Sequence, residues 1–164
     1  MGMKSRTTIL LLLAAGAALA GNPAESWRRL YGDREKQVLA TSTKEDDAAL
    51  AADVLAGAAE LAGDREFRIL LLEKAWELGR RGVPGYRTAL AALTRLGETV
   101  PERLEGCEML RIDIFVDLHR YSDGPAKVAA GEELVHERIR VARRRIDDRK
   151  WEAARKLLWD AQVT

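Results

Sequence analysis

The sequence is poor in the residues that build disulfides, metal centres and nucleophilic sites. Its 164 residues include one cysteine, two histidines and four prolines. A lone cysteine, Cys107, cannot form an internal disulfide, so stability has to come from packing, and we expect Cys107 to be a buried small apolar residue. No Gly-x-Ser-x-Gly turn, phosphate-binding loop or dinucleotide-binding pattern is present, and we predict no nucleophilic catalysis and no cofactor.

The two histidines do not complete a metal-binding motif. Glu133 and His136 have the Glu-x-x-His spacing of di-iron bundles, but Val116 stands where a second glutamate would have to precede His119. His136 also begins like a zinc-protease motif, and Arg140 then replaces the second histidine. We therefore predict no metal site and place both histidines at the surface or near a helix end.

One enzymatic alternative stays open beside the preferred prediction of a protein that is not an enzyme. It is a small helical hydrolase whose acid lies among the carboxylates around His119, such as Asp113 or Asp117. Such a site requires these groups to converge in a concave pocket that shifts their pKa values.

The longest apolar run is short and lies at the N-terminus. Lys4 and Arg6 precede a run from residue 9 to residue 20, and the small-residue pattern at its end is typical of a secretory signal peptide cut before Gly21. About twelve apolar residues are fewer than the roughly twenty that a membrane-spanning helix needs. We predict that residues 1–20 are a signal peptide and that the protein is periplasmic or secreted. A membrane association is expected only if this segment stays uncleaved.

Positive and negative charges are nearly balanced in the sequence. The chain has 27 basic and 26 acidic residues, and residues 1–20 carry two of the basic ones and none of the acidic ones, so 25 basic and 26 acidic residues remain. This balance argues against nucleic acid as a partner. From residue 126 to residue 164, however, ten basic residues face seven acidic ones.

The basic segment is the one charge feature that points to a partner. We predict that Arg138, Arg145 and Arg149 bind a protein or peptide partner, and their positive charge would suit an acidic one. A solvated face with internal ion pairs is the alternative that we weigh most heavily, and a membrane or cell-envelope polymer is a further one.

Apolar spacing predicts an all-α fold. Residues 21–42 form a spacer or N-terminal cap, and residues 43–164 form a helical-repeat domain. Helices are expected at 44–62, 64–78, 84–96, 101–121, 125–146 and 148–161. The β-prone residues at 112–116 leave a strand there as an alternative. The apolar stripe expected in the fifth helix is Val128, Val135, Ile139, Ala142 and Ile146, and that in the sixth is Trp151, Ala154, Leu158 and Ala161.

The segment from Asp148 to Ala161 resembles the turn and second helix of a tetratricopeptide repeat. Trp151, Ala154, Leu158 and Ala161 match the family's aromatic, small and large packing positions, while Arg138 and Arg145 occupy positions where aromatic residues are usual. The resemblance covers residues 138–161. It implies antiparallel helical hairpins stacked as a short α-solenoid, in three pairs at 44–78, 84–121 and 125–161.

Residues 44–96 are also similar in texture to secreted bacterial proteins built from helical repeats, a likeness that implies no activity. We expect Trp76 and Trp151 to pack in the core, and Trp159 to lie on the flank of the last helix. The function that these observations favour is a non-enzymatic interaction or scaffold module outside the cytoplasm. Because no capping residue follows Ala161, the alternative of a structural N-terminal part of a longer protein stays open.

Overall fold

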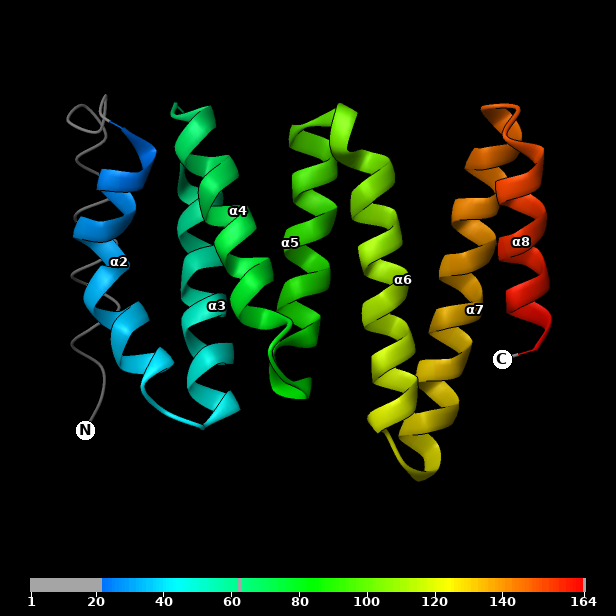
Figure 1. Cartoon of the computed structure of the whole chain (residues 1–164), viewed down its shortest axis with the longest axis horizontal. Coiled ribbons are helices and arrows are strands. Elements are labelled where there is room, and N and C mark those ends of the chain that lie inside the picture. The colour runs from blue at the N-terminus through cyan, green and yellow to red at the C-terminus, as the bar shows by residue number, and fades with distance from the viewer. Residues whose placement is uncertain (1–21, 62, 164) are drawn as a thin grey trace. The chain divides into compact units, whose positions relative to one another are not determined.

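The computed structural model describes residues 22–61 and 63–163, and these residues are helical throughout apart from short connections (Figure 1). The predicted signal peptide and its cleavage site lie outside the described residues. The described ranges contain no strand, so the all-α prediction is confirmed and the β-prone residues 112–116 are helical. The described residues form seven α-helices: α2 (Pro23–Leu39), α3 (Lys44–Glu60), α4 (Arg65–Gly79), α5 (Tyr86–Thr99), α6 (Leu104–Tyr121), α7 (Gly124–Asp147) and α8 (Trp151–Gln162). None of these described helices is both long and apolar enough to cross a membrane.

The chain forms two compact units that divide after Pro101. The described part of the first unit carries α2 to α5, and the second unit carries α6 to α8. The boundary falls within the predicted helix pair at 84–121, so α5 and α6 belong to different units.

The first unit is built around the hairpin of α3 and α4, against which α5 packs. The apolar residues of α3 and α4 that recur every three to four residues are buried, as the period of a helix requires. They comprise Leu50, Val54, Ala58, Leu61, Phe67, Leu71, Ala75 and Leu78. The carboxylate of Asp64 accepts a hydrogen bond from the Phe67 backbone N–H at 2.9 Å, which confirms Asp64 as the N-cap of α4.

Two short 3₁₀ turns begin with or near a proline and lead into the next α-helix. Val83–Gly85 precedes α5, and Pro101–Arg103 precedes α6. The first turn brings the backbone close to the end of α4, since a Cβ on Gly79 would lie only 2.8 Å from the carbonyl oxygen of Gly85. Glycine is therefore required at this contact.

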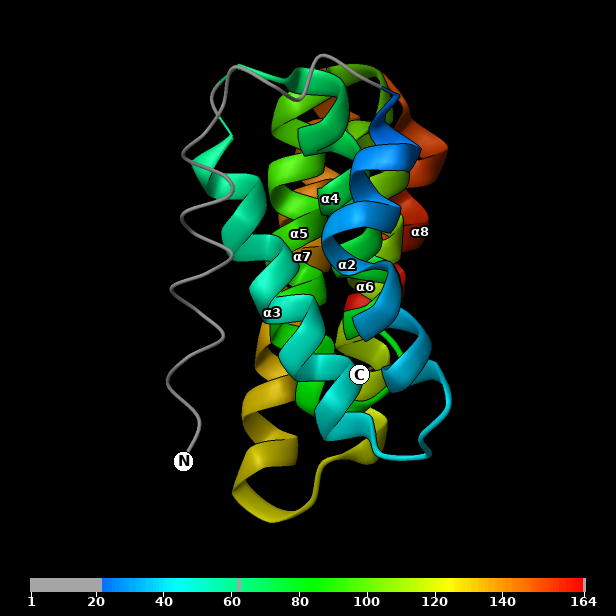
Figure 2. The ribbon, with the colours of Figure 1, turned by 90° about the vertical axis from the view of Figure 1, so that its left-hand side faces the viewer.

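The segment expected to form a spacer with one or two helical turns is a helix of 17 residues, α2. Figure 2 shows α2 and α3 running antiparallel, joined by residues 40–43. Trp27 and Tyr31 are buried and their rings stack with centroids 4.9 Å apart. Trp27 Nε1 donates to the Glu35 carboxylate at 2.8 Å, and Lys74 on α4 pairs with the same carboxylate at 3.2 Å. This cluster fixes α2 to the first unit as a packed helix.

In the second unit, α7 packs against both α6 and α8. The apolar stripe predicted for α7 is correct only in part. Ala142 is buried and Val135 and Ile139 are half-buried, but Val128 is 63 % exposed and Ile146 is also exposed. The buried residues of α7 are Ala130, Leu134, Glu137, Val141, Ala142 and Arg145. The buried face of the helix thus contains two charged residues, which an apolar pattern assigns to solvent.

The inward face of α8 also differs from the prediction. Ala154 is buried as expected, but Leu157 accompanies it instead of Leu158, and Trp151 is 60 % exposed. The prediction that Trp151 packs in the core is therefore wrong. Trp159 is 66 % exposed, in accord with its expected place on the flank of the helix.

Candidate functional site

The buried charges of α7 meet those of α6 in one ion-pair cluster. Glu108 on α6 is 1 % exposed, and its carboxylate lies 3.2 Å from Arg140, 3.0 Å from Arg144 and 3.4 Å from Arg145. Arg145 is itself 3 % exposed and also lies 3.4 Å from Glu105. Three guanidinium groups therefore surround one buried carboxylate.

Glu137 extends the cluster from the other end. Its carboxylate accepts hydrogen bonds from Arg111 Nε at 2.7 Å and from Arg140 Nη2 at 2.9 Å. Burial on its own raises the pKa of Glu137, but the hydrogen bonds and positive charges of Arg140 and Arg111 outweigh it and hold that pKa below its ordinary value. The cluster therefore ties α6 to α7 by ion pairs.

The three arginines predicted to bind a partner do not form one exposed surface. Arg145 belongs to the buried cluster, and Arg138 is half-buried and donates to the backbone oxygen of Asp160 at 2.6 Å. Arg149 is exposed in the turn between α7 and α8, where its φ of 59° is unusual for a residue other than glycine. Two of the three guanidinium groups are therefore engaged inside the unit.

An apolar surface lies instead on one flank of α8. Trp151, Arg155, Leu158 and Gln162 recur at helical spacing and share this flank. Together with Ile146 of α7, Ala154 and Trp159 they line an open hollow of about 340 Å³. We call Ile146, Trp151, Leu158 and Trp159 the α7–α8 apolar face. All four side chains are exposed although all are large and apolar.

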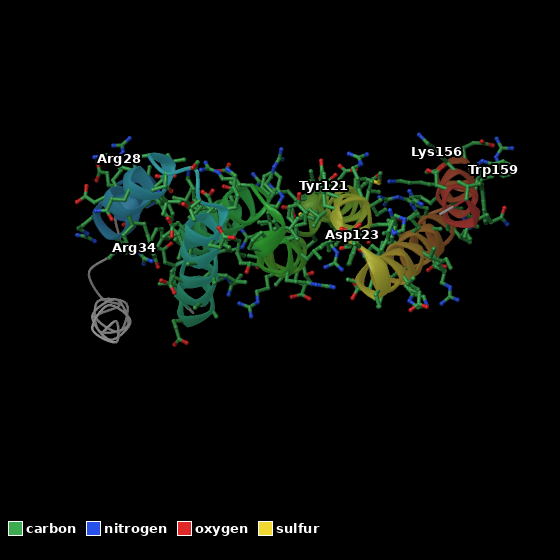
Figure 3. All side chains as sticks on the ribbon, turned by 90° about the horizontal axis from the view of Figure 1, so that it is seen from below. Arg28, Arg34, Tyr121, Asp123, Lys156 and Trp159 are labelled. Carbon is green, nitrogen blue, oxygen red and sulfur yellow. The ribbon has the colours of Figure 1, made fainter. Side chains whose placement is uncertain are left out.

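A second hollow adjoins this face on α8 and has charged walls. It is lined by Glu152, Ala153, Arg155, Lys156 and Trp159 and measures about 790 Å³. Figure 3 shows Lys156 and Trp159 projecting outward from α8. Arg155 donates to Glu152 at 2.7 Å. The two hollows share Arg155 and the indole of Trp159.

The hollow beside His119 does not contain the carboxylates that the hydrolase alternative names. The hollow beside His119 is lined by His119, Val128, Gly131, Glu132, Val135 and His136 and includes neither Asp113 nor Asp117. Asp113 is exposed, and Asp117 accepts from Arg120 at 3.5 Å. That the two histidines share a hollow could not be read from their spacing in the sequence, because they come from different helices.

The side chains that commonly bind metals are not clustered in the described residues either. Among the residues that the structure describes, no group of three or more histidine, cysteine, aspartate or glutamate side chains is placed to hold an ion. Cys107 is buried as expected, and burial raises the pKa of its thiol.

No protein-family model, curated protein or solved structure matches this chain.

Proposed function

We propose that the protein is a non-enzymatic binding module that works outside the cytoplasm and holds a protein or peptide segment on the α7–α8 apolar face. The observation that carries the proposal is the exposure of two indoles, Trp151 and Trp159, on one flank of a single helix. Each large aromatic side chain buries about 150–250 Å² when covered, and tryptophans are over-represented among the residues that dominate binding energy.

The rim of this face favours a partner that carries carboxylates. Arg155 and Lys156 line the adjoining hollow, and both side chains are exposed. We expect a segment whose apolar side chains enter the hollow beside Leu158 and whose acidic side chains meet Lys156 and Arg155. The partner is then an amphipathic acidic segment, in keeping with an acidic protein or peptide rather than nucleic acid.

We also propose that the helical hairpins are tetratricopeptide-like and that they stack as a short solenoid. Successive antiparallel packing within each unit and the match of Asp148 to Ala161 support this view. In repeat proteins each hairpin needs a neighbour to cover its apolar side. The uncovered flank of α8 is the kind of surface on which such a neighbour, or a partner that imitates one, would lie.

The location outside the cytoplasm rests on the signal-like segment at residues 1–20 and is tested first. Mass spectrometry of the protein purified from its native host should give a mature chain that begins at Gly21. A chain that keeps residues 1–20 would contradict the predicted cleavage.

Binding is tested with the chain from Gly21 to Thr164 as bait in cross-linking capture from the secreted and periplasmic fractions. The dissociation constant of each captured protein is then measured with the parent chain, with Trp159→Ala and with Leu39→Ser. Leu39 is the matched control because it is an exposed apolar residue on α2, outside the proposed face. We expect Trp159→Ala to weaken binding at least about tenfold, which is about 1.4 kcal/mol. Equal binding by all three chains would overturn the assignment of this face.

A further inference from the structure

Two arginines of the first unit line a hollow that the proposed function does not use. Arg68 of α4 and Arg95 of α5 form its charged walls, and the hollow measures about 360 Å³. The remaining lining residues are Ala58, Ala59, Leu72, Glu98 and Thr99. All of them lie between residues 22 and 101, so the site is complete within one unit.

The guanidinium groups at this hollow keep most of their hydrogen-bonding capacity. Arg68 Nη2 donates to Thr99 Oγ1 at 3.4 Å, and its Nε is buried without a hydrogen bond to any described residue. Arg95 Nη1 reaches the backbone oxygen of Leu55 only at 3.5 Å. A guanidinium has five N–H donors. Arg95 is exposed, whereas the buried Nε of Arg68 is a donor without an acceptor, which is unfavourable, so Arg68 in particular would gain from an added acceptor.

The surroundings hold these donors in place and leave space in front of them. Thr99 Oγ1 donates to the backbone oxygen of Arg95 at 2.7 Å, and Arg65 donates to the backbone oxygen of Thr99 at 2.9 Å. Ala58 and Ala59 have short side chains, and with Leu72 they make the rest of the wall apolar. Hydrogen bonds to charged groups are stronger beside an apolar wall than in water.

We propose that this hollow binds a carboxylate through Arg68 and Arg95. The planar guanidinium matches a carboxylate in a two-point hydrogen bond. Arg68 and Arg95 together with Glu98 give the lining residues a net charge of +1, which suits a single negative charge better than a doubly charged phosphate. The carboxylate comes from a small organic acid or from the C-terminus of a peptide. The site is independent of the α7–α8 apolar face.

The test is a titration of the isotope-labelled full-length mature chain followed by NMR at constant ionic strength. The probes are sodium acetate, sodium chloride, inorganic phosphate, and one tripeptide prepared with a free and with an amidated C-terminus. We expect saturable shifts of the Arg68 Nε–H and Thr99 backbone N–H signals with acetate and none with chloride. Tighter binding of the free tripeptide than of acetate, with loss on amidation, identifies a peptide terminus as the ligand. Binding of acetate that is as tight as that of the tripeptide identifies a small acid.

Variants decide whether the two arginines are responsible. Arg68→Gln and Arg95→Gln should each weaken acetate binding at least about tenfold. Arg28→Gln removes the same charge from an exposed site on α2 (Figure 3) and should leave binding unchanged. If Arg68→Gln changes the amide spectrum as a whole, Arg68→Lys replaces it in the test. Arg68→Lys keeps the charge but loses the planar guanidinium. The proposal is overturned by the absence of saturable shifts, by equal shifts with chloride, by tighter binding of phosphate than of acetate, or by unchanged binding in both arginine variants.

Discussion

Glu108 on α6 and Arg145 on α7 lie 3.4 Å apart with almost none of either side chain exposed. Such a pair gives little net stability when compared with apolar residues of the same size, because both charges lose their hydration. Removing only one of the two charges is costly, because the other charge then stays buried without this partner. The pair therefore specifies which face of α7 meets α6.

The first prediction follows from the numbers of charged partners in this cluster, because Glu108 has three and Arg145 has two. Glu108→Ala leaves three guanidinium groups without their shared carboxylate and should lower the free energy of unfolding by about 3–5 kcal/mol. Arg145→Ala should cost less, because Glu108 retains Arg140 and Arg144. Urea unfolding followed by circular dichroism measures both. Equal losses, or a loss under about 1 kcal/mol for Glu108→Ala, would contradict this account of the cluster.

The second prediction concerns the stability of the protein at acidic pH. The pKa of Glu137 is lower in the folded protein than its ordinary value of 4.5, so the unfolded chain binds a proton more readily. The resulting stability is present in full well above pH 4.5 and is lost as the pH falls through the folded pKa. Glu137→Gln should therefore make the urea midpoint less dependent on pH below about 4.5 than it is in the parent chain.

The control for this prediction is Glu152→Gln. Glu152 is an exposed partner of Arg155, and such exposed pairs contribute little to stability. Its variant should keep the pH dependence of the parent chain. If Glu137→Gln and Glu152→Gln behaved alike, the lowered pKa of Glu137 would not be the source of acid sensitivity.

Apolar spacing predicted the helices of the first unit well because most of the residues that these helices bury are apolar, with Asp47 as a charged exception. Leu50, Val54, Phe67 and Leu71 are buried as their periodicity requires. In α7 the same rule chose the stripe through Val128 and Ile146, because it assigns charges to solvent. The observed face instead buries Glu137 and Arg145, whose partners on α6 no spacing within α7 could indicate. Ion pairs between helices, together with buried apolar residues such as Leu134 and Val141, therefore set the face that α7 buries.

The candidate sites were predicted less well, for a related reason. Arg138 and Arg145 were grouped with Arg149 by charge alone, and charge does not distinguish an internal ion pair from an exposed contact. The exposed indole of Trp151 was assigned to the core because the tetratricopeptide resemblance places an aromatic there. The hollow of Arg68 and Arg95 joins residues of different helices, and nothing in their separation along the chain indicates that they meet.

The third prediction tests the close approach of Gly79 and Gly85. In Gly79→Ala, the new Cβ would meet the Gly85 carbonyl oxygen at 2.8 Å and the Ala89 backbone nitrogen at 3.0 Å. Backbone atoms cannot move aside cheaply, so we expect a loss of about 1–3 kcal/mol in the free energy of unfolding.

Two glycines without close neighbours serve as controls. A Cβ on Gly63 or on Gly106 would meet no described atom within 4 Å. Gly63→Ala should leave stability nearly unchanged, and Gly106→Ala, inside α6, should raise it by about 0.5–1 kcal/mol because alanine favours helix. A Gly79→Ala variant as stable as Gly63→Ala would show that the turn relaxes without cost.

The last prediction concerns the contacts that hold α2 in place. Trp27 Nε1 and Lys74 Nζ both bond the Glu35 carboxylate, and Lys74 Nζ also lies 5.4 Å from the centre of the Trp27 ring. Burial lowers the pKa of Lys74, but its hydrogen bond to Glu35 and the charges of Glu35 and Glu77 outweigh this and raise the pKa overall, so the ammonium stays charged. Trp27→Ala should cost about 3–5 kcal/mol, as for loss of a buried aromatic side chain.

Trp27→Phe separates the hydrogen bond from the packing. It keeps an aromatic ring beside Tyr31 but loses the donor to Glu35, so we expect a cost of only about 0.5–1.5 kcal/mol for the missing bond. Because Trp27 and Lys74 share one carboxylate, the losses from Trp27→Phe and Lys74→Met should not add in the double variant. Urea unfolding of the four chains gives the coupling. Strict additivity would mean that Trp27 and Lys74 contribute to the docking of α2 independently of each other.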